Sequence, residues 1–158
     1  AKGFDLLISA WKPKFGCLFV IGEGPERESL EALVNARGLA DSVFLLGHKN
    51  PAIDYISSAD LVVIPSRNEG FSYVFAEALL ERTPVISTNV PIPNEVLPKE
   101  YLCVIDSVEA IGQLLETTLS DMSGLEHSFS PLFDYAKKNL TLSRSRDKTL
   151  AAYSALIE

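Results

Sequence analysis

Short apolar runs alternate along the chain with longer segments whose apolar residues recur at helical spacing. The apolar runs, which predict strands, lie at 17–21, 43–46, 61–64, 84–87 and 102–105. The helical patterns lie at 4–11, 25–38, 51–58, 70–81, 107–119 and 141–157. Residues 120–130 have the composition of a loop.

The expected strands are short and apolar on both faces, which is typical of strands covered by helices on each side. Their alternation with helices predicts an α/β fold, a Rossmann-like doubly wound parallel sheet, in one domain spanning 1–158. The chain opens inside what should be the first crossover helix. We therefore expect that a first strand is missing and that an edge of the sheet is left exposed.

Composition narrows the function classes. The chain has 158 residues and a formal charge of −7, which argues against a nucleic-acid surface. It has neither a membrane-length apolar run nor the pattern of a signal peptide at its start. Cys17 and Cys103 lie in apolar runs, so we expect two buried, reduced thiols; a disulfide would need an oxidising compartment. With two histidines and no Asp-x-Asp pair, we expect no metal site.

Ligands of open α/β sheets bind beyond the carboxyl ends of the strands, where three polar segments fall. In the first, Gly22 and Gly24 would let the backbone approach a ligand, although a plain strand-to-helix turn has the same composition. A dinucleotide fingerprint would need a glycine where Arg27 stands. The second segment holds His48, a lone histidine of a kind more often found at the surface than in catalysis.

The third segment, 64–78, carries the strongest signal: a strand end, a polar turn and a helix start, whose free N–H groups attract anions. Glu69 and Glu77 are eight residues apart, or about 12 Å along a continuous helix. That spacing favours an extended polyol phosphate over a catalytic carboxylate pair, which needs roughly 5–10 Å. Glu77 has apolar sequence neighbours, and a carboxylate among apolar side chains costs free energy unless it has a hydrogen-bond partner. A ribose diol is one such partner. The alternatives are a helix cap for Glu69 and a surface position for Glu77.

These residues carry a family resemblance. The segment EGFSYVFAEA at 69–78 is similar to the pattern E-G-F-G-x-x-x-x-E-A, with PS before it at 65–66 and TPVI after it at 83–86. GEGP at 22–25, FLLG at 44–47 and KG at 2–3 match further family motifs in order. The chain thus resembles, over nearly its whole length, the retaining GT-B glycosyltransferases of family 4, as in lipopolysaccharide and mannoside synthesis.

The resemblance implies residue roles. Glu69 would contact the transferred sugar and Lys2 would neutralise the leaving diphosphate, which makes them the catalytic candidates. Glu77 would hold the ribose, and the turn of His48 would lie against the base. The implied donor-binding set is Gly22, Gly24, His48, Ser66, Gly70, Phe71, Ser72, Tyr73, Val74 and Glu77. Such enzymes use no metal and no cofactor beyond the nucleotide-sugar substrate.

The resemblance also implies a place in a larger enzyme. The chain would be the C-terminal, donor-binding half of a GT-B glycosyltransferase whose N-terminal acceptor domain is absent. The full enzyme would transfer a hexose, with retention, from a UDP-sugar to a glycan or lipid-linked acceptor, whereas the fragment alone should be inactive. Because nucleotide-sugars are made in the cytoplasm, we expect a cytoplasmic enzyme, with peripheral association at the inner face of the membrane.

The sequence departs from the family pattern at two positions. Ser72 stands where glycine is commonest, and Arg82 stands where a glycine usually precedes the following strand. Two alternatives stay open. One is a related GT-B nucleotide-sugar epimerase, and the other is a non-catalytic flavodoxin-like binding module, which would carry an acidic cluster where Gly22-Glu23-Gly24 stands.

Overall fold

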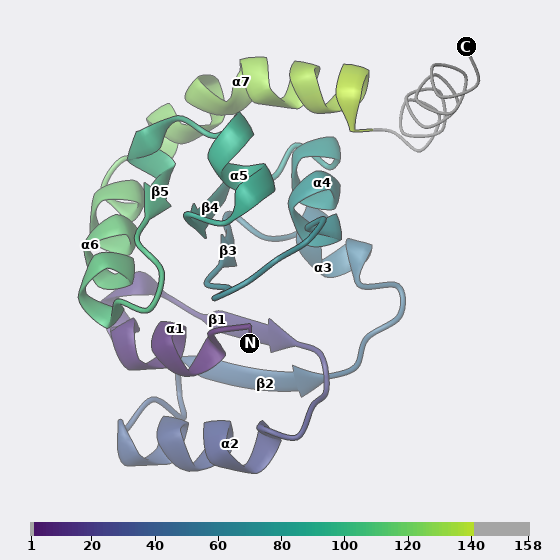
Figure 1. Cartoon of the computed structure of the whole chain (residues 1–158). Helices are drawn as coiled ribbons and strands as arrows, with labels where there is room; N and C mark the ends of the chain where they lie inside the picture. The colour runs from purple at the N-terminus through teal and green to yellow at the C-terminus, as the bar shows by residue number, and fades with distance from the viewer. Residues whose placement is uncertain (1, 141–158) are drawn as a thin grey trace.

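The computed structural model describes residues 2–140, which form helices packed around short parallel strands (Figure 1). In chain order the elements are α1 (Phe4–Ala10), η1 (Pro13–Phe15), β1 (Leu18–Ile21), α2 (Arg27–Ala36), β2 (Val43–Gly47), α3 (Ile53–Ser57), β3 (Val62–Ile64), α4 (Tyr73–Leu80), β4 (Val85–Thr88), α5 (Pro91–Val96), η2 (Lys99–Tyr101), β5 (Leu102–Cys103), α6 (Val108–Leu119) and α7 (Met122–Asn139). The predicted α/β fold with parallel strands is confirmed.

The described strands form two sheets. β1 pairs with β2, and β3 pairs with β4, which pairs with β5, always in parallel. Among residues 2–140 no ladder joins β1 to β3, so one edge of each strand lacks a strand partner. The described strands thus form two separate sheets, and both the exposed edge and the missing strand stay predictions.

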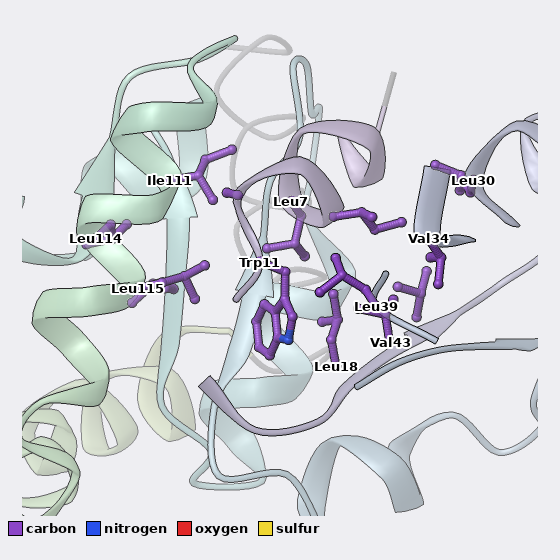
Figure 2. Close-up of a cluster of buried hydrophobic side chains, with 14 residues drawn as sticks. Leu7, Trp11, Leu18, Leu30, Val34, Leu39, Val43, Ile111, Leu114 and Leu115 are labelled. Carbon is purple, nitrogen blue, oxygen red and sulfur yellow. The ribbon is translucent and has the colours of Figure 1, made fainter. Parts of the chain in front are cut away.

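Two apolar clusters hold the layers together. The first contains Leu7 and Ile8 of α1 and the adjoining Trp11, packed with side chains of β1, α2, β2, β4 and α6. Figure 2 shows the α2 side chains on one side of Leu7 and the α6 side chains on the other. The second contains Phe75 and Leu79 of α4 with the buried face of α7. Each cluster buries large aliphatic and aromatic side chains, which is the dominant favourable term in folding.

The loop predicted for 120–130 is wrong, because α7 begins at Met122. The Asp121 side chain accepts a hydrogen bond from the Gly124 N–H at 3.0 Å and so caps the helix. The buried residues of this helix recur at helical spacing: Leu125, Phe129, Phe133 and Ala136. Their burial outweighs the weak helix propensity of the Ser, Gly and Pro residues here. The helix expected at 141–157 lies outside the described residues.

Further differences are local. The sequence did not indicate α5, and β5 is shorter than the expected strand. Cys17 is exposed rather than buried because it precedes β1, whereas Cys103 is partly buried in β5; both are free thiols. No helix within the described part of the chain combines the length and the apolar character that crossing a membrane requires.

Candidate functional site

The turns that follow β1, β2 and β3 hold most of the residues singled out from the sequence. Parallel strands within a sheet have their carboxyl ends at the same edge, so these turns face the region where ligands of such folds bind. They cover 22–26, 48–52 and 65–72. Lys2 and Gly3 precede α1, and their contacts bring them to the same region.

Lys2 and Ser66 meet on the carboxylate of Glu69. The Lys2 Nζ donates to Glu69 Oε1 at 2.7 Å, and the Ser66 Oγ donates to the same oxygen at 2.8 Å. The Glu69 side chain is only 11% exposed, whereas that of Lys2 is 60% exposed. The structure thus brings together the two residues that the sequence singled out for catalysis, 67 positions apart.

A close backbone contact makes this meeting possible. Gly3 has φ +73°, and a Cβ at this position would lie 1.9 Å from the carbonyl oxygen of Pro65. Only glycine fits such a contact, so the chain before α1 can lie directly against the end of β3. On the other side, the buried Thr88 Oγ1 donates to the Ser66 carbonyl at 2.6 Å. The loop of Ser66 is therefore fixed from both sides.

The helix after this loop begins at Tyr73 rather than Gly70. Ser72 takes an extended conformation, φ −80° and ψ 95°, and occupies the N-cap position without a side-chain capping bond. The extended backbone of Ser72 keeps it outside the helix, so the helix begins at the next residue. Among the described residues, the N–H groups of Tyr73 and Val74 have no hydrogen-bond acceptor, as is usual at a helix start. They can donate to an anion.

Glu77 is exposed, and the expectation of a buried carboxylate is wrong. Helical periodicity turns its sequence neighbours Phe75, Ala76 and Ala78 inward and leaves Glu77 on the outer face, one turn after Tyr73. The spacing of about 12 Å for a continuous helix does not apply either, because residues 69–72 are not helical. Among residues 2–140, the Glu77 side chain has no hydrogen-bond or ion-pair partner.

Two aromatic side chains stand at the start of α4. Phe71 and Tyr73 make an edge-to-face contact with ring centroids 5.1 Å apart. Tyr73 is 68% exposed, and Phe71 is also exposed. Gly70, on the preceding turn, has open space around its α-carbon. The edge of the loop is therefore accessible and partly apolar, a surface on which a sugar face can pack.

The turns after β1 and β2 form a second group. The Gly22 N–H donates to the Gly47 carbonyl at 2.9 Å, and the Glu23 carboxylate lies over the α-carbon of Gly47. Arg27 holds that carboxylate at 3.0 Å and also donates to the Leu45 carbonyl at 3.0 Å. Where a dinucleotide site would have a glycine, this chain thus has an arginine that fixes the turn.

His48 and Gly24 belong to this second group and are both exposed. The hydrogen bond from Gly22 to Gly47 brings the turn of Gly22 and Gly24 beside the turn that begins at His48. In the part of the chain that the structure describes, no hydrogen bond or ion pair connects them to Lys2 or Glu69. A ligand contacting both groups would have to extend between them.

Sequence reasoning missed an ion-pair network beside Glu69. Arg67 donates from Nη1 and Nη2 to the two carboxylate oxygens of Asp5, each at 2.7 Å, and from Nε to Asp106. The hydrogen bonds and charge of Arg67 hold the pKa of Asp5 below its ordinary value of 3.8. The only signal in the sequence is that Arg67 lies inside the motif and Asp5 lies three positions after Lys2.

A groove on the surface and the distribution of possible metal ligands bear on the remaining sequence predictions. A groove of about 320 Å³ runs between α1 and α6, lined by residues such as Lys12, Arg37 and Glu116, and contains none of the sequence-predicted site residues. Within residues 2–140, no three His, Cys, Asp or Glu side chains gather in a way that could hold a metal ion. Metal independence remains a prediction.

Comparison with known proteins shows which family shares this sequence. The family model for glycosyl transferases group 1 matches residues 1–131. The chain is similar to the O-antigen biosynthesis glycosyltransferase WclY of Escherichia coli, with 27% identity over 139 residues. That match covers 87% of this chain but 35% of WclY, so the chain spans about a third of the length of that relative.

Solved structures show the same fold. The C-terminal domain of the glycosyl transferase group 1 protein LpcC from Francisella tularensis has a TM-score of 0.78 and 25% identity, covering 89% of this chain and 80% of that domain. Anabaena HepE in complex with UDP has a TM-score of 0.82 and 21% identity, covering 96% of this chain and 45% of HepE. The described fold is that of one half of a GT-B protein, similar to the C-terminal domain of LpcC.

Proposed function

The chain belongs to the family of glycosyl transferases group 1, and on this basis we propose that it is the donor-binding half of a nucleotide-sugar-dependent glycosyltransferase. The proposal extends to residues 1–158 as one domain, with the acceptor site on a second domain of the full enzyme. The short share of WclY that the chain covers supports this division.

The observation that carries the proposal is the meeting of Lys2, Ser66 and Glu69 beside the start of α4. In glycosyl transfer the leaving group is a nucleoside diphosphate, which gains negative charge as the glycosidic bond breaks. An ammonium group and free helix-terminal N–H groups are the donors that stabilise such charge. Lys2 and the amides of Tyr73 and Val74 supply both, while Glu69 and the amides of Gly70, Phe71 and Ser72 contact the sugar.

The donor that fits this site is a UDP-sugar. The carboxylate of Glu77 is exposed and has no partner among residues 2–140, and it accepts hydrogen bonds from the ribose hydroxyls. The turn of His48 lies against the base, while Gly22 and Gly24 let the backbone approach the nucleotide. HepE, which shares the fold, is solved in complex with UDP. No metal is required, because Lys2 and the helix-terminal amides meet the charge of the diphosphate.

The remaining features concern the full enzyme. It transfers a hexose with retention to a glycan or lipid-linked acceptor in polysaccharide or lipopolysaccharide synthesis, as the name of the relative WclY suggests. It works in the cytoplasm and associates peripherally with the inner face of the membrane. Because the proposal assigns the acceptor site to a second domain, we expect residues 1–158 alone not to catalyse transfer.

Calorimetric titration with UDP, GDP and ADP tests the donor site. We expect UDP to bind, and the variant Glu77→Ala to bind it about 10- to 100-fold more weakly, because a charged hydrogen bond to the ribose is lost. Glu81→Ala is the matched control, since Glu81 is an exposed glutamate just after α4. Equal UDP affinity in wild type and Glu77→Ala would contradict the assignment of Glu77.

Product analysis with the full-length enzyme and a UDP-sugar tests the reaction. A new glycosidic bond of retained configuration is the expected product. An epimerised nucleotide-sugar would instead identify the related GT-B epimerase. Transfer by the isolated chain at a rate above donor hydrolysis would contradict the assignment of the acceptor site to a separate domain.

A further inference from the structure

Arg67 occupies an unusual place in the proposed site. It lies between Ser66 and Glu69 in the sequence, yet its guanidinium binds the carboxylates of two distant residues and not that of Glu69. Nη1 and Nη2 donate to Asp5, each at 2.7 Å, and Nε donates to Asp106. A fork-to-fork pair of this kind fixes direction as well as distance.

The network joins three segments that are far apart in the sequence. Asp5 lies in the first turn of α1, Arg67 in the loop after β3, and Asp106 in the turn between β5 and α6. Asp106 has φ +60°, a left-handed conformation in which aspartate is several-fold enriched among residues other than glycine. Its carboxylate accepts the hydrogen bond from the Arg67 Nε. The two carboxylates that bind Arg67, called the clamp below, therefore come from two separate segments.

The start of α1 and the loop after β3 are joined at three points. Gly3 packs against Pro65, Lys2 pairs with Glu69, and Asp5 pairs with Arg67. The Lys2 side chain is long and exposed, so its own ion pair constrains the loop little. The Arg67 fork is planar, makes two bonds to one carboxylate, and is 30% exposed. It is the better suited of the two ion pairs to set where Glu69 lies.

We propose that Arg67 is a positioning residue, whose clamp by Asp5 and Asp106 holds the loop of Ser66 and Glu69 against Lys2, and that Arg67 is not a ligand of the diphosphate. The inference rests on the proposed function of Lys2 and Glu69. Two carboxylates surround one guanidinium, so the cluster carries a net charge of about −1 and does not attract an anion. Of the two cations in this loop region of the described chain, Lys2 is the one that meets the diphosphate.

The first test measures the loop without any ligand. Backbone ¹⁵N order parameters at 67–70 should fall from about 0.85 in the wild type to below about 0.7 in Arg67→Gln and in Asp5→Asn. Arg67→Lys keeps the charge but loses the fork, so it should behave as Arg67→Gln does. Lys14→Gln is the control, because it removes one positive charge from an ion pair with Glu116 and leaves this loop untouched. Wild-type order parameters in Arg67→Lys or Arg67→Gln would overturn the proposal.

The second test measures UDP binding by calorimetry. Arg67→Gln and Asp5→Asn should each weaken binding about five- to tenfold, and the double variant should be no weaker than the weaker single variant, because both act through one ion pair. If Arg67 instead contacted the diphosphate, Asp5→Asn would leave binding unchanged or tighten it. That result, or additive losses in the double variant, would overturn the proposal.

The two tests separate this proposal from the function on which it rests. If the wild type binds no nucleotide, the proposed function fails, and the order parameters alone decide whether Arg67 fixes the loop. If the wild type binds UDP and the Arg67 variants bind it equally well, the donor site stands and the positioning role of Arg67 is overturned.

Discussion

The α-carbon of Gly3 lies so close to the carbonyl group of Pro65 that a Cβ at position 3 would come within 1.9 Å of the oxygen. The contact joins the chain before α1 to the end of β3, and so it determines where Lys2 can reach. The Lys2–Gly3 pair in the sequence thus has a mechanical reason: the glycine permits the approach that brings the lysine to Glu69.

Gly3→Ala should destabilise the protein by about 2–4 kcal/mol, because it adds a backbone clash to a left-handed conformation that alanine disfavours. The shift is measured by urea denaturation. Gly24→Ala is the control for stability, since a Cβ there meets nothing within 4 Å. Equal stability of the two variants would mean that the contact between Gly3 and Pro65 does not hold in solution.

The ion pair of Asp5 should make stability depend on pH in the acid range. Hydrogen bonds from Arg67 lower the folded-state pKa of Asp5 below 3.8, so the pair stabilises the protein above that pH and loses its effect as pH falls through the folded pKa. Both groups are partly exposed, so we expect about 1 kcal/mol or less at pH 7.

Thermal midpoints of wild type and Asp5→Asn, followed from pH 7 to pH 2.5, check this. The difference between the two proteins should stay constant above about pH 5 and shrink below about pH 4. Asp41→Asn is the control, because Asp41 is exposed and, among the described residues, its side chain has no partner. A difference for Asp5→Asn that persists unchanged at pH 2.5 would rule out the ion pair as its cause.

Arg82 compensates for a backbone position that favours glycine. Its φ is +62°, just after α4, and its guanidinium lies 5.0 Å from the centroid of the Phe133 ring. Arg82→Gly should relieve about 1 kcal/mol of backbone strain and lose a cation–π contact of about 0.5–1 kcal/mol, so stability should change little. In a Phe133→Leu background, the same substitution should stabilise by about 1 kcal/mol. Identical effects in both backgrounds would show that the two side chains are not coupled.

Phe129 should be essential for docking α7. It is fully buried, with ring centroids 4.7 Å from Tyr101 and 5.9 Å from Phe133. Phe129→Ala should cost about 3–5 kcal/mol in chemical denaturation, whereas Tyr135→Ala, on the exposed face of the same helix, should cost about 0.5 kcal/mol or less. If both substitutions lowered the free energy of unfolding by a similarly small amount, the result would support the loop predicted from the sequence at 120–130.

The two thiols should react at different rates. Burial raises the pKa of Cys103 to about 11, whereas Cys17 is exposed. Because the thiolate is the reactive form, iodoacetamide at pH 8 should modify Cys17 first and Cys103 slowly. Mass spectrometry of timed samples shows the order, and Cys17→Ser should leave only the slow reaction. Equally fast labelling of Cys103 would contradict its burial.

Apart from α5, the order of strands and α-helices as far as Leu119 is predictable from the sequence, because apolar runs and helical periodicity agree there with the turn residues between them. The helix α7, beyond Leu119, is not predictable in this way. Its intrinsic helix propensity is poor, and its stability comes from side chains that pack on other elements. Glu77 is the opposite case, where apolar sequence neighbours suggest burial but the helix turns them to the other face.

The candidate site is only partly predictable. Motif resemblance singles out Lys2 and Glu69, and the structure shows them in contact. The contact itself depends on Gly3 and Pro65, which are 62 positions apart, and no local pattern specifies such a distance. Arg67 and its carboxylates escape notice for the same reason, because ion pairs between distant segments leave no periodic signal in one sequence.

The interruption between the two sheets bears on cooperativity. Within residues 2–140 no ladder joins β1 to β3, so the half that contains β1 and β2 and the half that contains β3 to β5 are coupled by other contacts. These include the ion pairs of Lys12 and Lys14 with Glu116 and the packing of α1 with both halves in one cluster. Opening of this seven-residue helix would let the halves unfold as separate units with their own hydrogen-exchange protection. Since Lys2 and Gly3 immediately precede the same helix, the event that divides the fold into two foldons also disassembles the site.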